Sequence, residues 1–406
     1  MFSRKYEEIS ELVAQWGSPI YIFEKEALLN AVNDFKSAFS SVHPNLIIAY
    51  PYKTNNLKEV IKYLHQLGIW AEVTSGIEIE MAKRSGLAPS EIIFNGPYKK
   101  DKDLLTALET DIYIYIDNEA ELSRLVKLID IATIPRSPVS VGIRVTSSGL
   151  VGGWSKFGFD IDNGDADKIV KKISKIPKIR LTGIHAHFKS NINDIDLYKK
   201  VMRKLASFIN RLIENNLLIP KYIDIGSGFA ISSPSPINIP NWQVPSIQEY
   251  ADVVKCEFVN LPEEVFLIVE PGRYLVSSAI SLITKIVSLQ DNNNKYKIIT
   301  DAGVHLVPGR DIYQYPIKNL YPREEILVIS DIYGCLCDSL DILGSDVELG
   351  IPEIDDLICI SNVGAYDLVR SFSWNLSKAP VAMIDKNGVT TLIRVDETIE
   401  HIWGTQ

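Results

Sequence analysis

One pattern recurs eight times between residues 46 and 272: a short apolar, β-branched or aromatic run, a turn, and a segment with helical spacing. The apolar runs occupy residues 46–52, 70–74, 91–95, 112–116, 139–145, 181–188, 222–225 and 266–269. They are too apolar for strands with one face in water, and therefore predict strands buried on both faces of a parallel sheet. The segments between them, such as 57–67 and 194–214, place apolar residues at helical intervals.

Eight strand–helix units in about 225 residues predict a (β/α)8 barrel of the TIM type. An open doubly wound sheet contains the same units and is the alternative fold. After residue 272, short apolar runs alternate with clusters of Gly, Pro, Asn and Asp, which predicts a mostly β domain. These later runs lie at residues 281–288, 296–300, 326–329, 357–360, 381–384 and 389–395, with a predicted hairpin turn at 292–294. The run 18–23 is expected to join this second domain, so we predict a barrel of residues 25–272 and a β-rich domain of residues 1–24 and 273–406.

Composition and charge exclude several classes of protein. The chain carries 42 Lys and Arg against 51 Asp and Glu, a net charge of -9, and lacks a basic run that could neutralise phosphates, so we expect no nucleic-acid partner. Its four cysteines form no Cys-x-x-Cys pair, which disfavours a disulfide scaffold and a zinc ribbon. The charged start lacks a signal-peptide core, and the most apolar later window, 274–289, is too short for a membrane span. We expect a soluble, cytoplasmic protein with no membrane partner.

Chemically reactive residues follow several of the predicted barrel strands, where barrels of this type place their active sites. Lys53 ends the first run; burial lowers the pKa of an amine and makes it nucleophilic, although a surface lysine is the alternative. Gly226-Ser-Gly228 follows the seventh run and Gly272-Arg273 the eighth, a position where such barrels bind phosphate. An isolated Gly-Ser-Gly also forms simple tight turns, so it is the combination that indicates a phosphate site.

Two histidines and one glutamate complete the candidate set. His185 and His187 share one face of the sixth run, which raises zinc binding as a possibility. Only His305 follows before His401, so ring stacking, hydrogen bonding or a core position is favoured over a metal site. Glu270 ends the eighth run, where it either pairs with Arg273 or faces a ligand. An amine, a phosphate site and a carboxylate in one barrel mouth indicate pyridoxal 5′-phosphate, which needs all three.

The residues then show a family resemblance. The chain resembles, along nearly its whole length, the fold type III pyridoxal-phosphate decarboxylases, the diaminopimelate, ornithine and arginine decarboxylase group. The motifs that carry the resemblance are Tyr50-Pro-Tyr-Lys53 with Asn55, Glu72-Val-Thr-Ser75-Gly76-Ile-Glu78, Ile93-Phe-Asn95-Gly96 with Lys99, Ser155-Lys-Phe-Gly158, Glu270-Pro-Gly-Arg273, Asp301-Ala-Gly303, Gly334-Cys-Leu-Cys337-Asp338-Ser339-Leu-Asp341 and Gly364-Ala-Tyr366. Their order along the chain makes the combined signal strong.

The resemblance implies an alanine racemase-like fold type III enzyme whose cofactor is pyridoxal 5′-phosphate and whose site holds no metal. Lys53 would carry the cofactor, His187 would stack on its ring, and Glu270 would meet the ring nitrogen. The phosphate would be surrounded by Gly226, Gly228, Gly272, Arg273, Ser190 and Tyr366.

The family also completes its active sites across a two-fold homodimer. Cys337 would then come from the other subunit to return a proton to the substrate carbon, with Asp338 near the distal end of the substrate. Asp338 and Asp341 suit a distal amine, and Arg310 suits a distal carboxylate. Structural alternatives are a buried small side chain for Cys337, a loop cap for Asp338, a core aromatic for Tyr366 and a surface charge for Arg310.

Several departures from the family pattern bear on the substrate. Lys189 and Ser227 stand where the family usually has glycine, Cys335 where proline is common, and the segment 308–313 is shorter than in diaminopimelate decarboxylases. This pattern is similar to decarboxylases of specialised metabolism that act on carrier-linked or conjugated amino acids. We predict α-decarboxylation of an amino acid or a carrier- or nucleotide-linked conjugate. The alternatives are an amino-acid racemase on the same fold, a non-catalytic decarboxylase-like regulator and, more remotely, a metal-dependent hydrolase.

Overall fold

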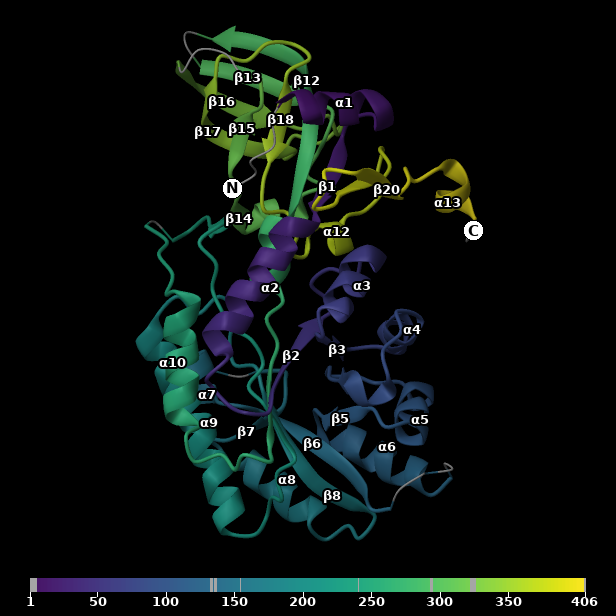
Figure 1. Cartoon of the computed structure of the whole chain (residues 1–406), viewed down its shortest axis with the longest axis vertical. Coiled ribbons are helices and arrows are strands. Elements are labelled where there is room, and N and C mark those ends of the chain that lie inside the picture. Colours follow the sequence, from purple (N-terminus) through teal and green to yellow (C-terminus); the bar gives the residue numbers. More distant parts are fainter. Residues whose placement is uncertain are drawn as a thin grey trace. The chain divides into compact units, whose positions relative to one another are not determined.

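The computed structural model describes residues 6–131, 134, 137–153, 155–239, 241–292, 295–321 and 326–404. The chain divides into two compact units, and Figure 1 labels their elements where there is room. The first, here called the barrel unit, comprises Asp34–Ala230 and Val244–Gly272. The second, here called the sheet unit, comprises Met1–Asn33, Ile231–Gln243 and Arg273–Gln406.

The barrel unit contains a closed parallel barrel. Its eight strands are β2 (Leu46–Pro51), β3 (Trp70–Val73), β4 (Ile92–Phe94), β5 (Tyr113–Ile116), β6 (Val139–Thr146), β8 (Ile179–Ala186), β9 (Tyr222–Asp224) and β11 (Phe266–Val269). Each strand pairs in parallel with the next, and β11 pairs back to β2, which closes the ring. A two-residue strand, β7 (Phe159–Asp160), extends β6 outside this ring. The predicted barrel is confirmed, and the open doubly wound sheet is excluded.

Helices connect the strands, as Figure 1 shows. They are α2 (Lys25–Phe39), α3 (Lys58–Gln66), α4 (Gly76–Arg84), α5 (Asp101–Glu109), α6 (Glu119–Ile129), α7 (Ser148–Val151), α8 (Asp165–Ile173), α9 (Ile195–Glu214) and α10 (Ile247–Glu257). The longest, α9, begins after Asp194, whose carboxylate accepts the N–H groups of Asp196 and Leu197 at 2.9 and 3.1 Å. This N-cap gives two otherwise unpaired backbone donors an acceptor, so the helix starts at the residue where the sequence pattern predicts it.

Large aromatic side chains fill the lower interior of the barrel. Tyr115 and Tyr222 belong to a buried cluster with apolar residues of neighbouring strands, and Tyr113 packs edge-on against Tyr222 at 4.5 Å between ring centroids. Gly142 and Gly183 lie beside the rings of Tyr115 and Tyr222, and a Cβ at either glycine would overlap the ring. Small residues therefore alternate with large ones to close the interior, as expected for a barrel of this size.

The sheet unit is mostly β. Its main sheet contains β1 (Ile20–Glu24), β12 (Ile280–Asn292), β13 (Lys295–Thr300), β15 (Ile317–Asn319), β16 (Leu327–Tyr333), β17 (Ile342–Gly350), β18 (Leu357–Ile360), β19 (Val381–Ile384) and β20 (Thr390–Arg394). A separate ribbon pairs β10 (Ser235–Pro236) with β14 (Tyr313–Gln314). Strand β1 pairs with β12 and β19, so the N-terminal run joins this sheet as predicted. The ends of β12 and β13 pair at Asn292 and Lys295, and residues 293–294 of the predicted turn lie outside the described residues.

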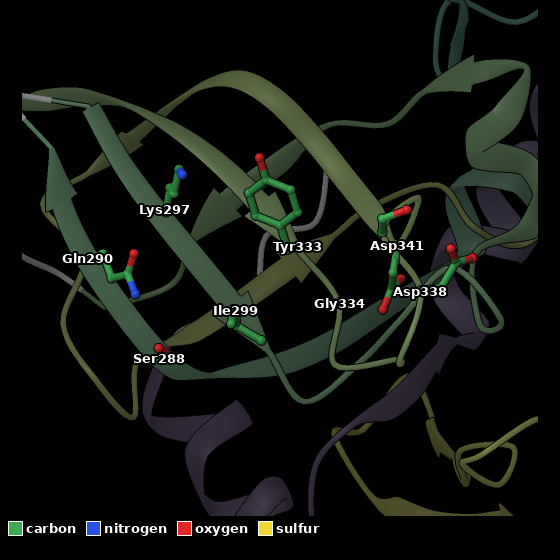
Figure 2. A pocket seen from close by; sticks show the side chains of 9 residues that line it. Ser288, Gln290, Lys297, Ile299, Tyr333, Gly334, Asp338 and Asp341 are labelled. Atoms are coloured by element: carbon green, nitrogen blue, oxygen red, sulfur yellow. The ribbon is translucent and has the colours of Figure 1, made fainter.

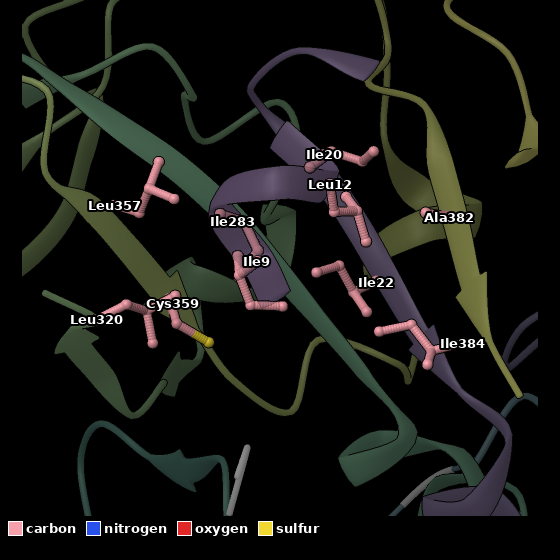
Figure 3. Close-up of a cluster of buried hydrophobic side chains, with 10 residues drawn as sticks. All are labelled: Ile9, Leu12, Ile20, Ile22, Ile283, Leu320, Leu357, Cys359, Ala382 and Ile384. Carbon is pink, nitrogen blue, oxygen red and sulfur yellow. The ribbon is translucent and has the colours of Figure 1, made fainter. Parts of the chain in front are cut away.

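The helices described in the sheet unit are short, apart from α1 (Tyr6–Trp16) and the start of α2. They are α11 (Arg273–Val276), α12 (Asp367–Arg370) and α13 (Ile399–Trp403). The sequence pattern did not predict α1. It buries Ile9 and Leu12 against Ile283 of β12 and Cys359 of β18, in the cluster drawn in Figure 3. Among the described helices, none combines the length and apolarity that crossing a membrane requires.

Candidate active site

The upper interior of the barrel is polar. Side chains alternate along a strand, so the residue two positions beyond an interior residue also points inward. Glu270 lies two residues beyond Ile268, and Asp224 two beyond Tyr222; both Ile268 and Tyr222 belong to the aromatic and aliphatic cluster. We use the name polar layer for the five buried interior residues Glu72, Asn95, His185, Asp224 and Glu270. Strand register alone therefore brings these groups to the carboxyl end of one barrel.

Lys53 is placed by the turn that follows β2, in which the Thr54 N–H donates to Pro51 O at 2.9 Å. Its amine forms an ion pair and hydrogen bond with Glu72, whose side chain is 1% exposed, whereas that of Lys53 is 45% exposed. Burial raises the pKa of Glu72 to about 7, although the ammonium of Lys53 acts in the opposite direction. The lysine amine is thus held at the rim of the barrel and not directed away from the polar layer.

Glu270 is the centre of the polar layer. The amide of Asn95 donates to its Oε1 at 2.8 Å, and Nε2 of His185 lies 3.7 Å from its Oε2. The ligand-type atoms of His185, Asp224 and Glu270 all lie within 4.8 Å of one another. Asp224 Oδ1 accepts the Gly226 N–H at 2.8 Å, whereas no donor group of the described residues reaches the buried Asp224 Oδ2, which can itself donate when it is protonated. His187 does not belong to this group, so the two histidines of the zinc alternative are separated.

Two carboxyl groups buried this close cannot both carry a charge without a large cost, so they share a proton. Burial, reinforced by the neighbouring Glu270, raises the pKa of Asp224 well above its ordinary value. Burial alone would raise the pKa of Glu270 as well, but His185, Lys53 and a hydrogen bond from Asp224 lower it below its ordinary value. The proton therefore resides on Asp224, and Glu270 remains a carboxylate.

A glycine turn follows β9 next to this acid pair. Gly226 and Gly228 adopt positive φ angles of 65° and 122°, and a Cβ on Gly226 would overlap the carbonyl oxygen of Ala186. The Ser227 N–H donates to Nδ1 of His187 at 3.2 Å, and Nε2 of His187 lies 3.2 Å from the Ser190 hydroxyl. Burial, with Arg144 nearby, lowers the pKa of His187, so its ring is neutral and Nε2 can donate. His187, Ser190 and the glycine turn are thus brought together as the sequence predicts.

Gly272 lies against the turn that carries Lys53, because a Cβ at residue 272 would overlap the Thr54 hydroxyl. The backbone of the segment after β11 therefore packs directly against a side chain of the turn that carries Lys53. This close approach explains a glycine at this position.

In the sheet unit, Arg273 lies between two tyrosine rings. Its guanidinium is 4.6 Å from the ring centroid of Tyr313 and 5.0 Å from that of Tyr366, and it donates to the Tyr313 hydroxyl at 3.2 Å. Tyr366 adopts a positive φ of 74° immediately before Asp367. The carboxylate of Asp367 accepts from the Gly309 N–H and the Tyr315 hydroxyl, both at 2.8 Å. Sequence reasoning linked Arg273 with Tyr366 but missed Tyr313.

Arg310 lies in a short 3-10 helix, Pro308–Asp311, and is partly exposed. Its side chain forms no ion pair with the described residues. Both the predicted carboxylate-binding role and the alternative of a surface charge are compatible with this position.

The segment 334–341, here called the cysteine loop, presents one exposed thiol and one partly buried thiol. Cys337 is exposed, whereas Sγ of Cys335 lies 3.2 Å from the carbonyl oxygen of Asp301. Burial raises the pKa of the Cys335 thiol to about 11, so Cys335 is the less reactive of the two. Asp338 is partly exposed and lines a pocket of about 280 Å³, shown in Figure 2. Its Oδ1 accepts the Leu340 N–H at 3.0 Å.

The structure does not favour Asp341 as the residue that binds a distal amine. Asp341 is 2% exposed, and its carboxylate oxygens accept the N–H groups of Val304 and Leu336, both at 2.7 Å. Both oxygens already accept backbone N–H groups, so this carboxylate organises the loop beside the pocket that Asp338 and Asp341 line.

Comparison with known proteins decides the family. The family model described as "Pyridoxal-dependent decarboxylase, pyridoxal binding domain" matches residues 26–277, more than half of the chain. The chain belongs to this family. A diaminopimelate decarboxylase from Aquifex aeolicus is 29% identical over 404 residues, which cover 97% of this chain and 93% of that protein. An L-glutamyl acyl-carrier-protein decarboxylase from Niallia circulans is 25% identical, covering 98% and 96%. A crystal structure of diaminopimelate decarboxylase from M. jannaschii in complex with L-lysine is 26% identical, with a TM-score of 0.87 and coverage of 98% and 93%.

These findings make the protein a fold type III decarboxylase that uses pyridoxal 5′-phosphate to remove a carboxylate from an amino acid. The relatives named here are decarboxylases, so the racemase and regulator alternatives are not favoured. The barrel unit fits the cofactor on its own geometry: a lysine amine, glycine turns with close backbone approach, and the buried carboxylate of Glu270 beside Asp224, whose Oδ2 no donor group of the described residues reaches. Sequence reasoning assigned no role to Glu72, Asn95 or Asp224. The sequence signal that could have found them is their position: each lies two residues after an aromatic or aliphatic residue that points into the barrel, and every second residue of a strand points to the same side.

Proposed function

We propose that this decarboxylase holds pyridoxal 5′-phosphate through Lys53 and acts on an α-amino acid or an amino-acid conjugate. The observation that supports this assignment is the position of the Lys53 amine, which pairs with Glu72 at the edge of the polar layer. The neighbouring exposed lysine, Lys58, lies on α3 and has no such partner among the described residues. When bound, the cofactor withdraws the electrons left on the substrate Cα as CO2 departs.

The residues assigned to the cofactor then have separate tasks. Glu270, kept as a carboxylate, faces the pyridine nitrogen and holds a proton there. Neutral His187 supplies a flat ring that stacks on the cofactor and is fixed by Ser190 and the Ser227 N–H. The phosphate is bound by backbone N–H groups around Gly226, Gly228 and Gly272, by Ser190, and by Arg273 with Tyr366.

Residues of the sheet unit complete the site in a homodimer. Cys337 of the cysteine loop donates a proton to the substrate Cα after CO2 has left, because it is the exposed thiol of the pair. Asp338 binds a distal amine or Arg310 a distal carboxylate, according to the substrate. We assign the cofactor-binding domain to residues 25–272, the completing domain to residues 1–24 and 273–406, and the enzyme to the cytoplasm.

Two classes of substrate remain in this proposal. The M. jannaschii relative was crystallised with L-lysine, which favours a free diamino acid, whereas the N. circulans relative acts on a carrier-linked glutamyl group. Lys189, where the family usually has glycine, adds an exposed cation next to Ser190. A cation there favours an acidic or phosphorylated conjugate over a free diamine.

The deciding experiment measures CO2 release by mass spectrometry from the cofactor-loaded protein. The panel contains free diamino acids, acidic amino acids and the same amino acids linked to a carrier protein or to a nucleotide. We expect CO2 from one class together with the matching amine. A racemised amino acid without CO2 from any member of the panel would reject decarboxylation.

A further inference from the structure

Two loops of the sheet unit meet because their strands are parallel. Strands β13 and β16 pair in parallel, so their carboxyl ends lie at the same edge of the sheet. The segment 301–304 follows β13, and the cysteine loop follows β16. Backbone contacts join the two: the Cys335 N–H donates to Ala302 O at 3.2 Å, and the Cys335 thiol lies against Asp301 O. The reactive thiol Cys337 therefore sits on a loop whose position depends on its neighbour.

Asp341 is the side chain that joins these loops. One carboxylate oxygen accepts the Val304 N–H from the first loop, and the other accepts the Leu336 N–H from within the cysteine loop. The backbone of Asp341 accepts from Gly334 N–H at 2.8 Å, which closes the base of the loop. Hydrogen bonds from backbone N–H groups to a carboxylate are charge-assisted and stronger than neutral ones.

Close packing around this carboxylate requires glycine on both loops. A Cβ on Gly334 would overlap the Asp341 carboxylate, and a Cβ on Gly303 would lie 2.9 Å from its Oδ2 and 2.7 Å from Leu336 Cγ. Figure 2 shows Gly334 and Asp341 beside each other at one end of the pocket. The carboxylate thus occupies space that the two glycines leave open, and both glycines belong to sequence motifs of the family.

The rest of the cysteine loop is exposed, in contrast to its base. Cys337, Ser339 and Leu340 are exposed, and Leu340 is 75% exposed. Apart from the local turn at Asp338, the contacts described here that fix this exposed part pass through residues 334–336 and 341. We propose that Asp341 is a positioning residue for the decarboxylation: its buried carboxylate ties the loop after β13 to the cysteine loop and thereby sets where Cys337 is presented. This inference rests on the proposed proton-donor role of Cys337.

The test replaces Asp341 by asparagine, which has nearly the same volume but only one oxygen acceptor. Holoenzyme is treated with a thiol-alkylating reagent, and modification of each cysteine is followed by peptide mass analysis. Release of the loop should expose the Cys335 thiol and raise its alkylation rate about tenfold, since one hydrogen bond to a charged group is lost. Cys256 on α10 is the internal control and should react at an unchanged rate. Asp338→Asn, the same change on the exposed part of the loop, should leave Cys335 protected.

A kinetic measurement separates positioning from general loss of structure. Asp341→Asn should lower kcat about 10- to 100-fold, because a small displacement of a reacting group costs this much. KM and the cofactor absorbance should stay close to those of the wild type, and misprotonated product should increase. Gly334→Ala, which displaces the carboxylate without changing charge, should act in the same way. Gly350→Ala is the matched control, because a Cβ there meets no atom within 4 Å.

Each outcome decides the inference. An Asp341→Asn enzyme with protected Cys335 and unchanged kcat overturns it. If Cys335 is released while Cys337→Ala retains full turnover and product partition, the loop role holds but the proposed role of Cys337 fails. Should both variants not fold, hydrogen exchange on the wild type replaces them: the Val304 and Leu336 amides must exchange far more slowly than the Ser339 amide. Equal exchange rates would overturn the inference.

Discussion

Inside the barrel, the buried polar groups lie two residues beyond the interior aromatic and aliphatic cluster. In the sheet unit, the thiols of Cys335 and Cys337 lie on a loop that a backbone hydrogen bond and the Asp341 carboxylate join to its neighbour. In the polar layer, Asp224 and Glu270 are positioned by strand register and share a proton. In the cysteine loop, the hydrogen-bond partners of the Asp341 carboxylate among the described residues are backbone N–H groups. In a barrel, the neighbouring strands determine both where a side chain lies and whether it is charged. A loop has no such neighbours on both sides, so a separate residue is needed to hold it in position.

The first way to test this contrast removes the amine at the rim of the barrel. Lys53→Ala should abolish turnover, by at least about a thousandfold, because the group that holds the cofactor is lost and no neighbour replaces it. The absorbance of the lysine-bound cofactor should disappear with it. Lys58→Ala, an exposed lysine at the start of α3, is the matched control and should leave both unchanged. A fully active Lys53→Ala enzyme would end the assignment of the whole polar layer.

The barrel also contains a buried charge pair that can be compared with Asp341. The Lys99 ammonium contacts both oxygens of Glu121 at 3.0 and 3.1 Å and donates to Tyr115 O at 2.8 Å, joining the segment after β4 to the end of β5. Lys99→Met should destabilise the fold by about 3–5 kcal/mol, because it leaves the Glu121 carboxylate buried without its cation. Urea unfolding measures this change.

Two further variants control that measurement. Lys102→Met on the exposed side of α5 should have little effect on the unfolding free energy. Adding Glu121→Leu to Lys99→Met should restore part of the stability, since the unpaired charge is removed. A single variant Lys99→Met as stable as the wild type would show that register alone holds this part of the barrel.

Much of the fold could be predicted from the sequence because its strongest patterns are local. The eight barrel strands are continuous apolar runs, since both faces of each strand are covered. Strand β17 was missed because its two buried residues, Leu343 and Leu349, are separated by a segment that contains Gly344 and Asp346, so it has no continuous apolar run. Strands β7, β10 and β14 have two residues each, too few to form a pattern.

Those site residues could be predicted whose type and position at a strand end are themselves unusual and indicate a catalytic or binding role. Lys53, His187 and the glycine turn were singled out because an amine, an imidazole and paired glycines at strand ends are unusual. The roles of Asp224 and Asp341 were not predictable in this way. Both are ordinary carboxylates in the sequence, and only the three-dimensional contacts show that Asp224 faces Glu270 and that Asp341 is occupied by backbone N–H groups.

The sheet unit offers a comparison between two thiols two residues apart. Cys337→Ala should lower amine formation about 100-fold, because general-acid donation to the substrate carbon is lost. Cofactor binding should change little. The ratio of amine to misprotonated product should therefore change more than the absorbance of the lysine-bound cofactor. Cys335→Ala should keep the product partition of the wild type, since the Cys335 thiol lies against Asp301 O and is not presented to a substrate. Unchanged product partition in Cys337→Ala would assign the proton to another group.

The smallest expected effect concerns the shared proton of the polar layer. In Asp224→Ala the hydrogen bond from the protonated Asp224 to Glu270 is lost, and the pKa of Glu270 should rise. As the pH falls through this raised pKa, Glu270 takes up a proton, so kcat/KM should decline on the acid side where the wild type is constant. Asp224→Asn should restore the wild-type profile, because its amide can donate to Glu270 while its oxygen accepts the Gly226 N–H. An asparagine variant that behaves like the alanine variant would show that the acid itself, and not its hydrogen bond, is required. If kcat/KM of the alanine variant does not change with pH on the acid side, Asn95 and His185 keep the pKa of Glu270 low. The barrel would then hold Glu270 as a carboxylate without a proton shared with Asp224.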